Sequence, residues 1–117
     1  MSIPHRLRFS LEQRQTESAR IIQRFPGRIP IIIEKSSRAA DIPDLPKNRY
    51  LAPGDMTVGQ FIYVIRKSIL LAPEKALFIF VGSTLPTTGM TVRELYHNFR
   101  HEDGFLYVTY SGESTFG

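Results

Sequence analysis

The sequence predicts an α+β domain, in which helices pack on a mixed four-stranded sheet behind a helical amino-terminal extension. At 117 residues with 42% hydrophobic content, the chain is long enough for one domain with one core and too short for two. Ser/Thr-x-x-Gln/Glu boxes, which mark helix starts, alternate with short apolar runs that lack a helical period and indicate strands. We therefore expect an extension over residues 1–27, a domain over 28–110 and a flexible tail over 111–117.

The amino-terminal extension contains one clear helix. Residues 1–9 include Pro4 and predict either a one-turn helix or a loose arm. Ser10 and Gln13 have capping-box spacing, and the residues that follow contain neither Gly nor Pro, so we expect a helix over 11–24. Because its apolar side chains gather near its end, only its last turns are expected to be buried.

Two strands are predicted next. Residues 28–35 hold four isoleucines without alternation, which is typical of a strand covered on both faces. Pro30 has no N–H, so it should lie at a strand start or where no ladder forms. Residues 47–52 alternate basic, aromatic and aliphatic side chains and predict a short strand, which Pro53 and Gly54 end.

The rest of the domain predicts two helices and two strands. Capping boxes begin the helices at Thr57 and Thr91, and apolar runs over 77–81 and 105–110 predict the strands. One face of each helix is apolar, formed by Val58, Phe61, Ile62, Ile65 and Ile69 in the first and by Val92, Leu95, Tyr96 and Phe99 in the second. The order ββαβαβ is that of a β-grasp sheet, since right-handed crossovers leave few other arrangements.

Several blocks of the sequence, taken in order, carry a resemblance to a known family. The blocks are Glu12-x-Arg14-x-x-Glu17, Phe25-Pro26-Gly27-Arg28-Ile29-Pro30-Ile31-Ile32-Ile33-Glu34-Lys35, Lys47-x-Arg49-Tyr50-Leu51-x-Pro53, Thr57-Val58-Gly59-Gln60-Phe61, Ala76-Leu77-Phe78-Ile79-Phe80-Val81 and Phe105-Leu106-Tyr107-Val108-x-Tyr110-Ser111-x-Glu113-Ser114-x-Phe116-Gly117. Together they strongly resemble the ubiquitin-like autophagy modifiers, the family of the GABA-receptor-associated protein and the microtubule-associated light-chain proteins. The match runs over residues 11–117 and implies a ubiquitin-like β-grasp fold.

The resemblance implies that Gly117 is a site of conjugation. In the family a cysteine protease exposes this glycine, an activating and a conjugating enzyme pass it on as a thioester, and it finally forms an amide with phosphatidylethanolamine. Phe116 would be read together with Gly117 by these enzymes. The modifier supplies only a carboxylate, so the resemblance implies no enzyme activity and no cofactor, and the lack of cysteine agrees with it. Gly117 is either encoded as the last residue or exposed by cutting.

The resemblance also implies that receptors with an acidic aromatic-x-x-aliphatic motif add a strand to the edge formed by residues 47–52. Lys47 and Arg49 would meet the acids, and Arg28 would be a nearby charge contact. The aromatic pocket would be lined by Glu17, Ile21, Pro30, Ile32, Lys47, Leu51 and Phe105. The aliphatic pocket would use Tyr50, Ala52, Pro53, Met56, Phe61, Val64 and Ile65.

Alternative readings accompany these sites. Ile32, Phe61 and Ile65 are equally explained as core residues, and a basic edge also protects a sheet from aggregation. Four positions depart from the family pattern, namely Gly27, Ala52, Ser68 and Gly104. Ala52 replaces a larger branched residue and should deepen or loosen the aliphatic pocket, and Ser68 removes a positive charge.

Other classes of function are disfavoured. His97 and His101 have helical spacing, but the Glu that zinc hydrolases need is missing, so we expect no metal site. The net charge of +4 favours acidic partners, but no basic stripe with interleaved aromatics indicates specific nucleic-acid binding. We expect a monomer in the cytoplasm that joins the autophagosome membrane when lipidated. The main alternative is a ubiquitin-like adaptor that uses the same groove on peptides, trafficking or cytoskeletal proteins and is never conjugated.

Overall fold

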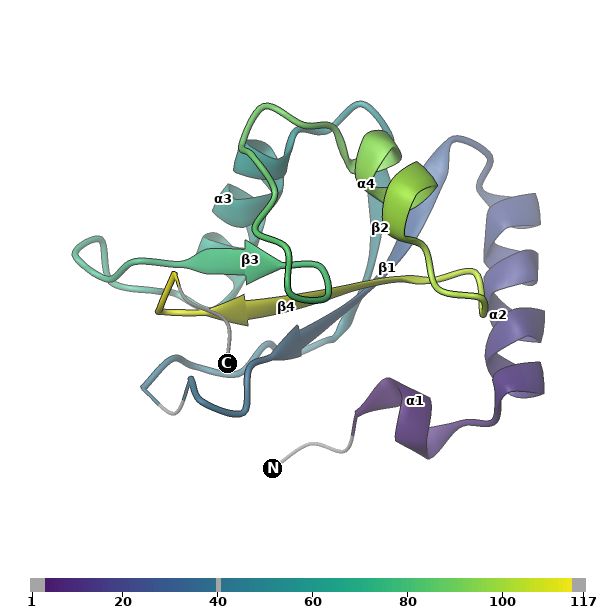
Figure 1. Ribbon diagram of the computed structural model, residues 1–117, viewed down its shortest axis with the longest axis horizontal. Coiled ribbons are helices and arrows are strands. Elements are labelled where there is room, and N and C mark those ends of the chain that lie inside the picture. The colour runs from purple at the N-terminus through teal and green to yellow at the C-terminus, as the bar shows by residue number, and fades with distance from the viewer. Residues whose placement is uncertain (1–3, 40, 115–117) are drawn as a thin grey trace.

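The computed structural model describes residues 4–39 and 41–114. Its central element is a four-stranded sheet in the order β2-β1-β4-β3 (Figure 1). The strands are β1 (Arg28–Lys35), β2 (Arg49–Pro53), β3 (Phe78–Phe80) and β4 (Leu106–Ser111). The two central strands β1 and β4 run parallel, and β2 and β3 pair with them in antiparallel fashion. The predicted mixed sheet of the β-grasp type is confirmed, and β2 is one of its two edge strands.

The observed strand boundaries differ from the predicted ones by one or two residues. The strand predicted over 47–52 begins at Arg49, where its register with β1 starts, and the one predicted over 77–81 is shorter at both ends. The last strand begins after Phe105, because the Phe105 N–H donates to the Asp103 carboxylate (2.9 Å) in a turn. It continues through Ser111, which pairs with Phe78, so Ser111 belongs to the sheet.

Helices α3 (Val58–Ser68) and α4 (Val92–Phe99) cover one face of the sheet (Figure 1). Both begin at the predicted capping boxes, in which the hydroxyls of Thr57 and Thr91 each accept an N–H bond at 3.1 Å. The core on this face is apolar and combines alternate residues of β1 with both helices. Its members include Ile29, Ile31, Ile33, Ala52, Val58, Phe61, Ile65, Val92, Leu95, Leu106, Val108 and Tyr110. Phe99 was predicted on the buried face of α4 but is 39% exposed.

Helices α1 (His5–Arg8) and α2 (Leu11–Arg24) cover the other face (Figure 1). The α2 boundaries match the prediction, and the alternative of a one-turn helix is observed for α1. The prediction that only the last turns of α2 are buried was wrong. The buried side chains of α2 are Arg14 and Ser18, whereas Ile22 and Phe25 are each 41% exposed. The early turns of α2 are buried because of a polar interaction. Arg14 donates to the buried carboxylate of Asp103 (2.6 Å), which follows α4 in the chain.

Candidate functional site

The candidate site is the open edge of β2. The N–H of Ile33 in β1 donates to the carbonyl of Asn48 (2.7 Å), and the register brings Tyr50 to the equivalent position two residues on. In an antiparallel pair, every second residue forms backbone hydrogen bonds to the partner strand, as Asn48 and Tyr50 do here. The backbone N–H and C=O groups of the residues between them point away from the partner strand. The backbone groups of Arg49 and Leu51 therefore face outward, where an added strand could bond to them.

A small hollow lies between this edge and α2. It has a volume of about 190 Å³. Its lining residues are Ile21, Pro30, Ile31, Arg49, Tyr50, Leu51 and Phe105. Four of the seven residues predicted for the aromatic pocket, Ile21, Pro30, Leu51 and Phe105, thus lie together here, and Ile32 is fully buried. The parallel ladder of β1 with β4 begins at Ile31, one residue after Pro30. Pro30, which has no N–H, therefore lies before this ladder, in agreement with the prediction that it lies where no ladder forms.

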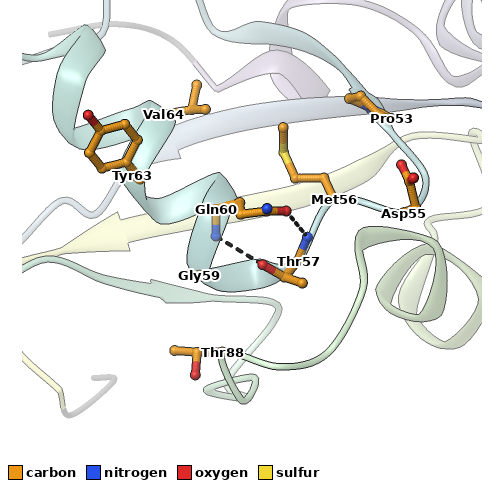
Figure 2. A pocket seen from close by; sticks show the side chains of 9 residues that line it. All are labelled: Pro53, Asp55, Met56, Thr57, Gly59, Gln60, Tyr63, Val64 and Thr88. Carbon is orange, nitrogen blue, oxygen red and sulfur yellow. Dashed lines mark hydrogen bonds between the residues drawn. The ribbon is translucent and has the colours of Figure 1, made fainter.

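Two further hollows lie on the α3 face of the same strand. One, of about 290 Å³, is lined by Ile33, Leu45, Pro46, Lys47, Arg49, Tyr50, Val64, Ile65 and Ser68. The other, of about 850 Å³, is lined by Pro53, Asp55, Met56, Thr57, Gly59, Gln60, Tyr63, Val64 and Thr88 (Figure 2). Val64 borders both hollows, which are therefore neighbours. Figure 2 shows that the capping box of Thr57 and Gln60 fixes the start of α3 beside the Met56 side chain.

The residues predicted for the aliphatic pocket are divided between these hollows and the core. Tyr50 and Ile65 line the hollow of about 290 Å³, and Pro53 and Met56 line the hollow of about 850 Å³. Ala52 and Phe61 are 0% and 1% exposed and belong to the core.

Positive charges surround the edge strand. Arg49 pairs with Glu17 of α2 (2.6 Å), which joins the edge to the opposite helix. Arg28 donates to the carbonyl of Leu51 (3.4 Å). Lys47, predicted for the aromatic pocket, is exposed, and it lines the 290 Å³ hollow and not the hollow beside α2. The hydroxyl of Ser68 donates to the Val64 carbonyl (2.9 Å), so this helix position adds a small polar group and no charge.

Sequence reasoning missed a buried polar network on the α2 face. The Asp103 carboxylate accepts bonds from Arg14 (2.6 Å), the Tyr107 hydroxyl (2.5 Å) and the Phe105 N–H (2.9 Å). Burial alone would raise the pKa of Asp103, but these bonds outweigh it and the pKa is lowered. The hydroxyl of Ser18 also donates to the Asp103 carbonyl. Long-range pairs of this kind leave no local pattern, so no signal in the sequence could have located them.

His5 of α1 lies beside this network. It is 1% exposed and packs against the rings of Phe9, Phe105 and Tyr107. Its Nε2 atom has no hydrogen-bond partner among the described residues, and the nearest carboxylate is that of Glu17 at 3.9 Å. Burial, followed by the positive charge of Arg49, lowers the pKa of His5.

The predicted conjugation residues Phe116 and Gly117 lie outside the described residues. The described part of the tail ends at Ser114, and its last two residues are exposed. Within residues 4–39 and 41–114, no three His, Cys, Asp or Glu side chains are grouped so that they could hold a metal ion. None of the helices in that part of the chain has both the length and the apolar composition needed to cross a bilayer.

The fold and the sequence were compared with known proteins. A family model described as "Autophagy protein Atg8 ubiquitin like" matches residues 13–117. Autophagy-related protein 8 of Saccharomyces cerevisiae (strain YJM789) is 56% identical over 109 residues, which cover 93% of this chain and 92% of the yeast protein. Autophagy-related protein 8B of Oryza sativa subsp. japonica is 55% identical over 112 residues, with 96% and 93% covered.

Solved structures agree. The crystal structure of Trypanosoma brucei ATG8 superimposes with a TM-score of 0.89 at 39% identity and covers 100% of both chains. Plasmodium falciparum Atg8, solved in complex with a Plasmodium falciparum Atg3 peptide, gives a TM-score of 0.88 at 31% identity, with 98% of this chain and 100% of that chain covered. The predicted resemblance is confirmed: this chain belongs to the Atg8 family of ubiquitin-like autophagy proteins.

Proposed function

We propose that this protein is an autophagy modifier that is conjugated through Gly117 to phosphatidylethanolamine and binds aromatic-x-x-aliphatic motifs of receptors along β2. The modifier itself is not an enzyme, since it contributes a carboxylate and other proteins contribute the thiolates. Its conjugated form would be held on the autophagosome membrane, and its free form would be a monomer in the cytoplasm. The proposal of a peptide site is supported chiefly by one observation, the hollows on opposite faces of an open edge strand.

That arrangement fits the spacing of the motif. In an added strand, side chains alternate between the two faces of the sheet, so two residues an odd number of positions apart point to opposite faces. The aromatic and aliphatic residues of the motif are separated by three positions. The aromatic ring would enter the hollow beside Ile21 and Phe105, and the aliphatic side chain would enter the hollows beside Tyr50 and Val64. The outward backbone groups of β2 would bond the peptide chain.

Charge supports an acidic peptide. Lys47 and Arg49 lie along the edge, and Arg28 lies at the start of β1, where its guanidinium donates to the Leu51 carbonyl. Because Glu17 already pairs with Arg49, an acidic peptide residue would share or replace that contact. Such exchanged surface pairs contribute modestly to affinity, so the hollows are expected to contribute most of it.

Calorimetric titration tests the peptide site. An acidic aromatic-x-x-leucine peptide should bind Leu51→Ala roughly tenfold or more weakly than the unchanged protein, because the substitution removes a wall of the hollow beside α2. Leu85→Ala is a matched control, since Leu85 is 47% exposed in the loop that follows β3 and lines none of the three hollows. Equal affinity of folded Leu51→Ala and the unchanged protein would remove the site from β2.

Conjugation would proceed through three acyl-transfer steps. The carboxylate of Gly117 would first react with ATP to give an adenylate and pyrophosphate. The thiolate of the activating enzyme would displace AMP to form a thioester, the thiolate of the conjugating enzyme would take over the acyl group, and the amine of the lipid would finally form the amide and release that thiol. The Plasmodium falciparum Atg8 complex with an Atg3 peptide supports a conjugating enzyme as a partner of this chain as well. The cysteine protease would act at the Gly117 carbonyl in both of its reactions. In processing it would hydrolyse a peptide bond to a following residue, and in delipidation it would hydrolyse the amide to the lipid amine.

The full chain is incubated with activating and conjugating enzymes of the family, ATP and vesicles that contain phosphatidylethanolamine. Mass spectrometry should find the lipid on Gly117, and deletion of Gly117 should abolish the adduct. If no adduct forms while the peptide still binds, the alternative holds, a ubiquitin-like adaptor that is never conjugated.

A further inference from the structure

Leu70 combines two properties that do not help the protein to fold. It has a φ of 53°, and no other residue except glycine has a positive φ within the described part of the chain. It is also 87% exposed, the largest value among the exposed large hydrophobic residues described. A leucine in this region of backbone space is strained, because its β-carbon crowds the backbone.

The end of α3 explains why this backbone conformation is required. The N–H of Leu71 donates to the Arg66 carbonyl (3.1 Å), and the N–H of Leu70 donates to the Lys67 carbonyl (3.3 Å). These two bonds form the Schellman motif, whose left-handed position is usually glycine. Glycine at position 70 would give the same turn without strain and without an exposed apolar side chain. Leu70 departs from the preference for glycine at this position, and its exposed side chain gains no packing within the protein. A strained residue of this kind indicates a position that serves contact with another molecule.

The turn over residues 70–77 is braced by side-chain hydrogen bonds from the end of α3, and the segment over residues 66–77 carries more cations than acids. The guanidinium of Arg66 donates to the carbonyls of Ala72 (3.1 Å) and Lys75 (2.7 Å). Lys67 and Lys75 are exposed on either side of Leu70 in the sequence, and the acid in the turn is Glu74. Together with Arg66 and Lys67 at the end of α3, the turn therefore presents an apolar side chain near three cations and one acid, which fits an anionic and partly apolar surface.

The turn also lies where the tail leaves the sheet. Phe78, which follows the turn, pairs with Ser111, and a β-carbon built on Gly112 would lie 3.8 Å from the carbonyl of Ala76. Figure 1 shows the connection between α3 and β3 at the same end of the molecule as the last described residues. From Ser114 to Gly117 a chain spans at most roughly 11 Å.

We infer that the turn over residues 70–77 is the membrane-contacting surface of the lipid-linked protein. Leu70 enters the interface between headgroups and acyl chains, and Lys67 and Lys75 lie against anionic lipids. The inference rests on the proposed conjugation at Gly117, because a lipid on that residue holds this end of the molecule against the bilayer.

A single tryptophan tests the contact, because the chain contains neither Trp nor Cys. Gly117→Cys is coupled chemically to maleimide-bearing phosphatidylethanolamine in vesicles that also contain phosphatidylcholine and phosphatidylserine. This coupling bypasses the enzymes, so a failure of enzymatic conjugation would not decide the outcome. In the coupled protein, the emission of Leu70→Trp should shift to the blue and lose intensity when brominated lipids are included. Leu85→Trp, beyond the opposite end of β3, should show neither change.

A second reporter removes the dependence on a tryptophan at the strained position. Glu74→Trp lies in the same turn and leaves Leu70 in place, so brominated lipids should quench it. Adding Leu70→Gly relieves the strain and removes the apolar side chain, and it should lower the equilibrium constant for contact roughly tenfold, as expected for partial burial of one leucine. Emission of both reporters that is unchanged by coupling, or quenching of Glu74→Trp that survives Leu70→Gly, would overturn the inference.

Discussion

The two faces of the sheet are attached to their helices by different chemistry. On the face of α3 and α4 the contacts are apolar, and residues such as Phe61 and Ile65 are 1% exposed. On the face of α1 and α2, aromatic contacts are combined with buried polar groups, and the helices bury His5, Arg14 and Ser18. The first attachment depends on volume and the second on correct pairing of buried charges and hydrogen bonds.

This difference matters for the proposed site because β2 borders both faces. Tyr50 packs with the apolar core, and its ring lies 5.7 Å from that of Phe61. Arg49 is tied through Glu17 to α2. The edge strand is therefore positioned from one side by packing and from the other by an ion pair.

The largest expected effect is on the apolar face. Phe61→Ala removes a fully buried ring and should lower the free energy of unfolding by about 4 kcal/mol, from lost burial and the cavity that remains. Equilibrium unfolding in urea measures the change. Tyr63→Ala on the same helix is the control, since Tyr63 is 61% exposed and should change stability by less than about 0.5 kcal/mol. Similar losses in both variants would contradict an apolar attachment of α3.

The polar face should respond next most strongly. Asp103→Asn keeps the shape of the side chain but leaves the buried Arg14 without its charge partner, so we expect a loss of about 3 kcal/mol. The neighbouring Glu102→Gln is exposed and should stay within about 0.5 kcal/mol. A loss below about 1 kcal/mol for Asp103→Asn would show that hydrogen bonding alone, without charge, holds α2 to the sheet.

The fold could be predicted because its signals are local. Capping boxes placed the starts of α2, α3 and α4, and the apolar run of residues 28–35 gave the bounds of β1. Strand ends were predicted less well, because they depend on where a partner strand begins. Phe105, for example, looks like strand in sequence but is held in a turn by Asp103.

For the candidate site at the β2 edge, the resemblance named most of the residues that line the hollows, but it did not predict how all of them are arranged. The resemblance named Ile21, Leu51 and Phe105, which line one hollow, but Lys47 lines another. The buried network of Arg14, Ser18 and Asp103 joins residues more than eighty positions apart, and hydrophobic periodicity carries no information on such pairs. The first turns of α2, which carry Arg14 and Ser18, were therefore not expected to be buried.

The smallest predicted effect is a pH dependence from His5. Burial and Arg49 lower its pKa below the ordinary 6.5, while Glu17, Asp103 and Glu34 act in the opposite direction. The unfolded chain therefore binds the proton more readily than the folded one. The stability contributed by neutral His5 is fully present above pH 6.5 and is lost as the pH falls from there toward the folded pKa.

Unfolding in urea between about pH 7 and about pH 5 measures this loss, compared with His5→Phe, which keeps an aromatic ring but cannot titrate. The variant should lose less stability on acidification than the unchanged protein. His97→Gln, at an exposed position of α4, is the matched control and should lose as much stability as the unchanged protein. If His5→Phe and the unchanged protein lost the same stability, protonation of His5 would not oppose the attachment of α1, and the pH dependence would have to come from other groups.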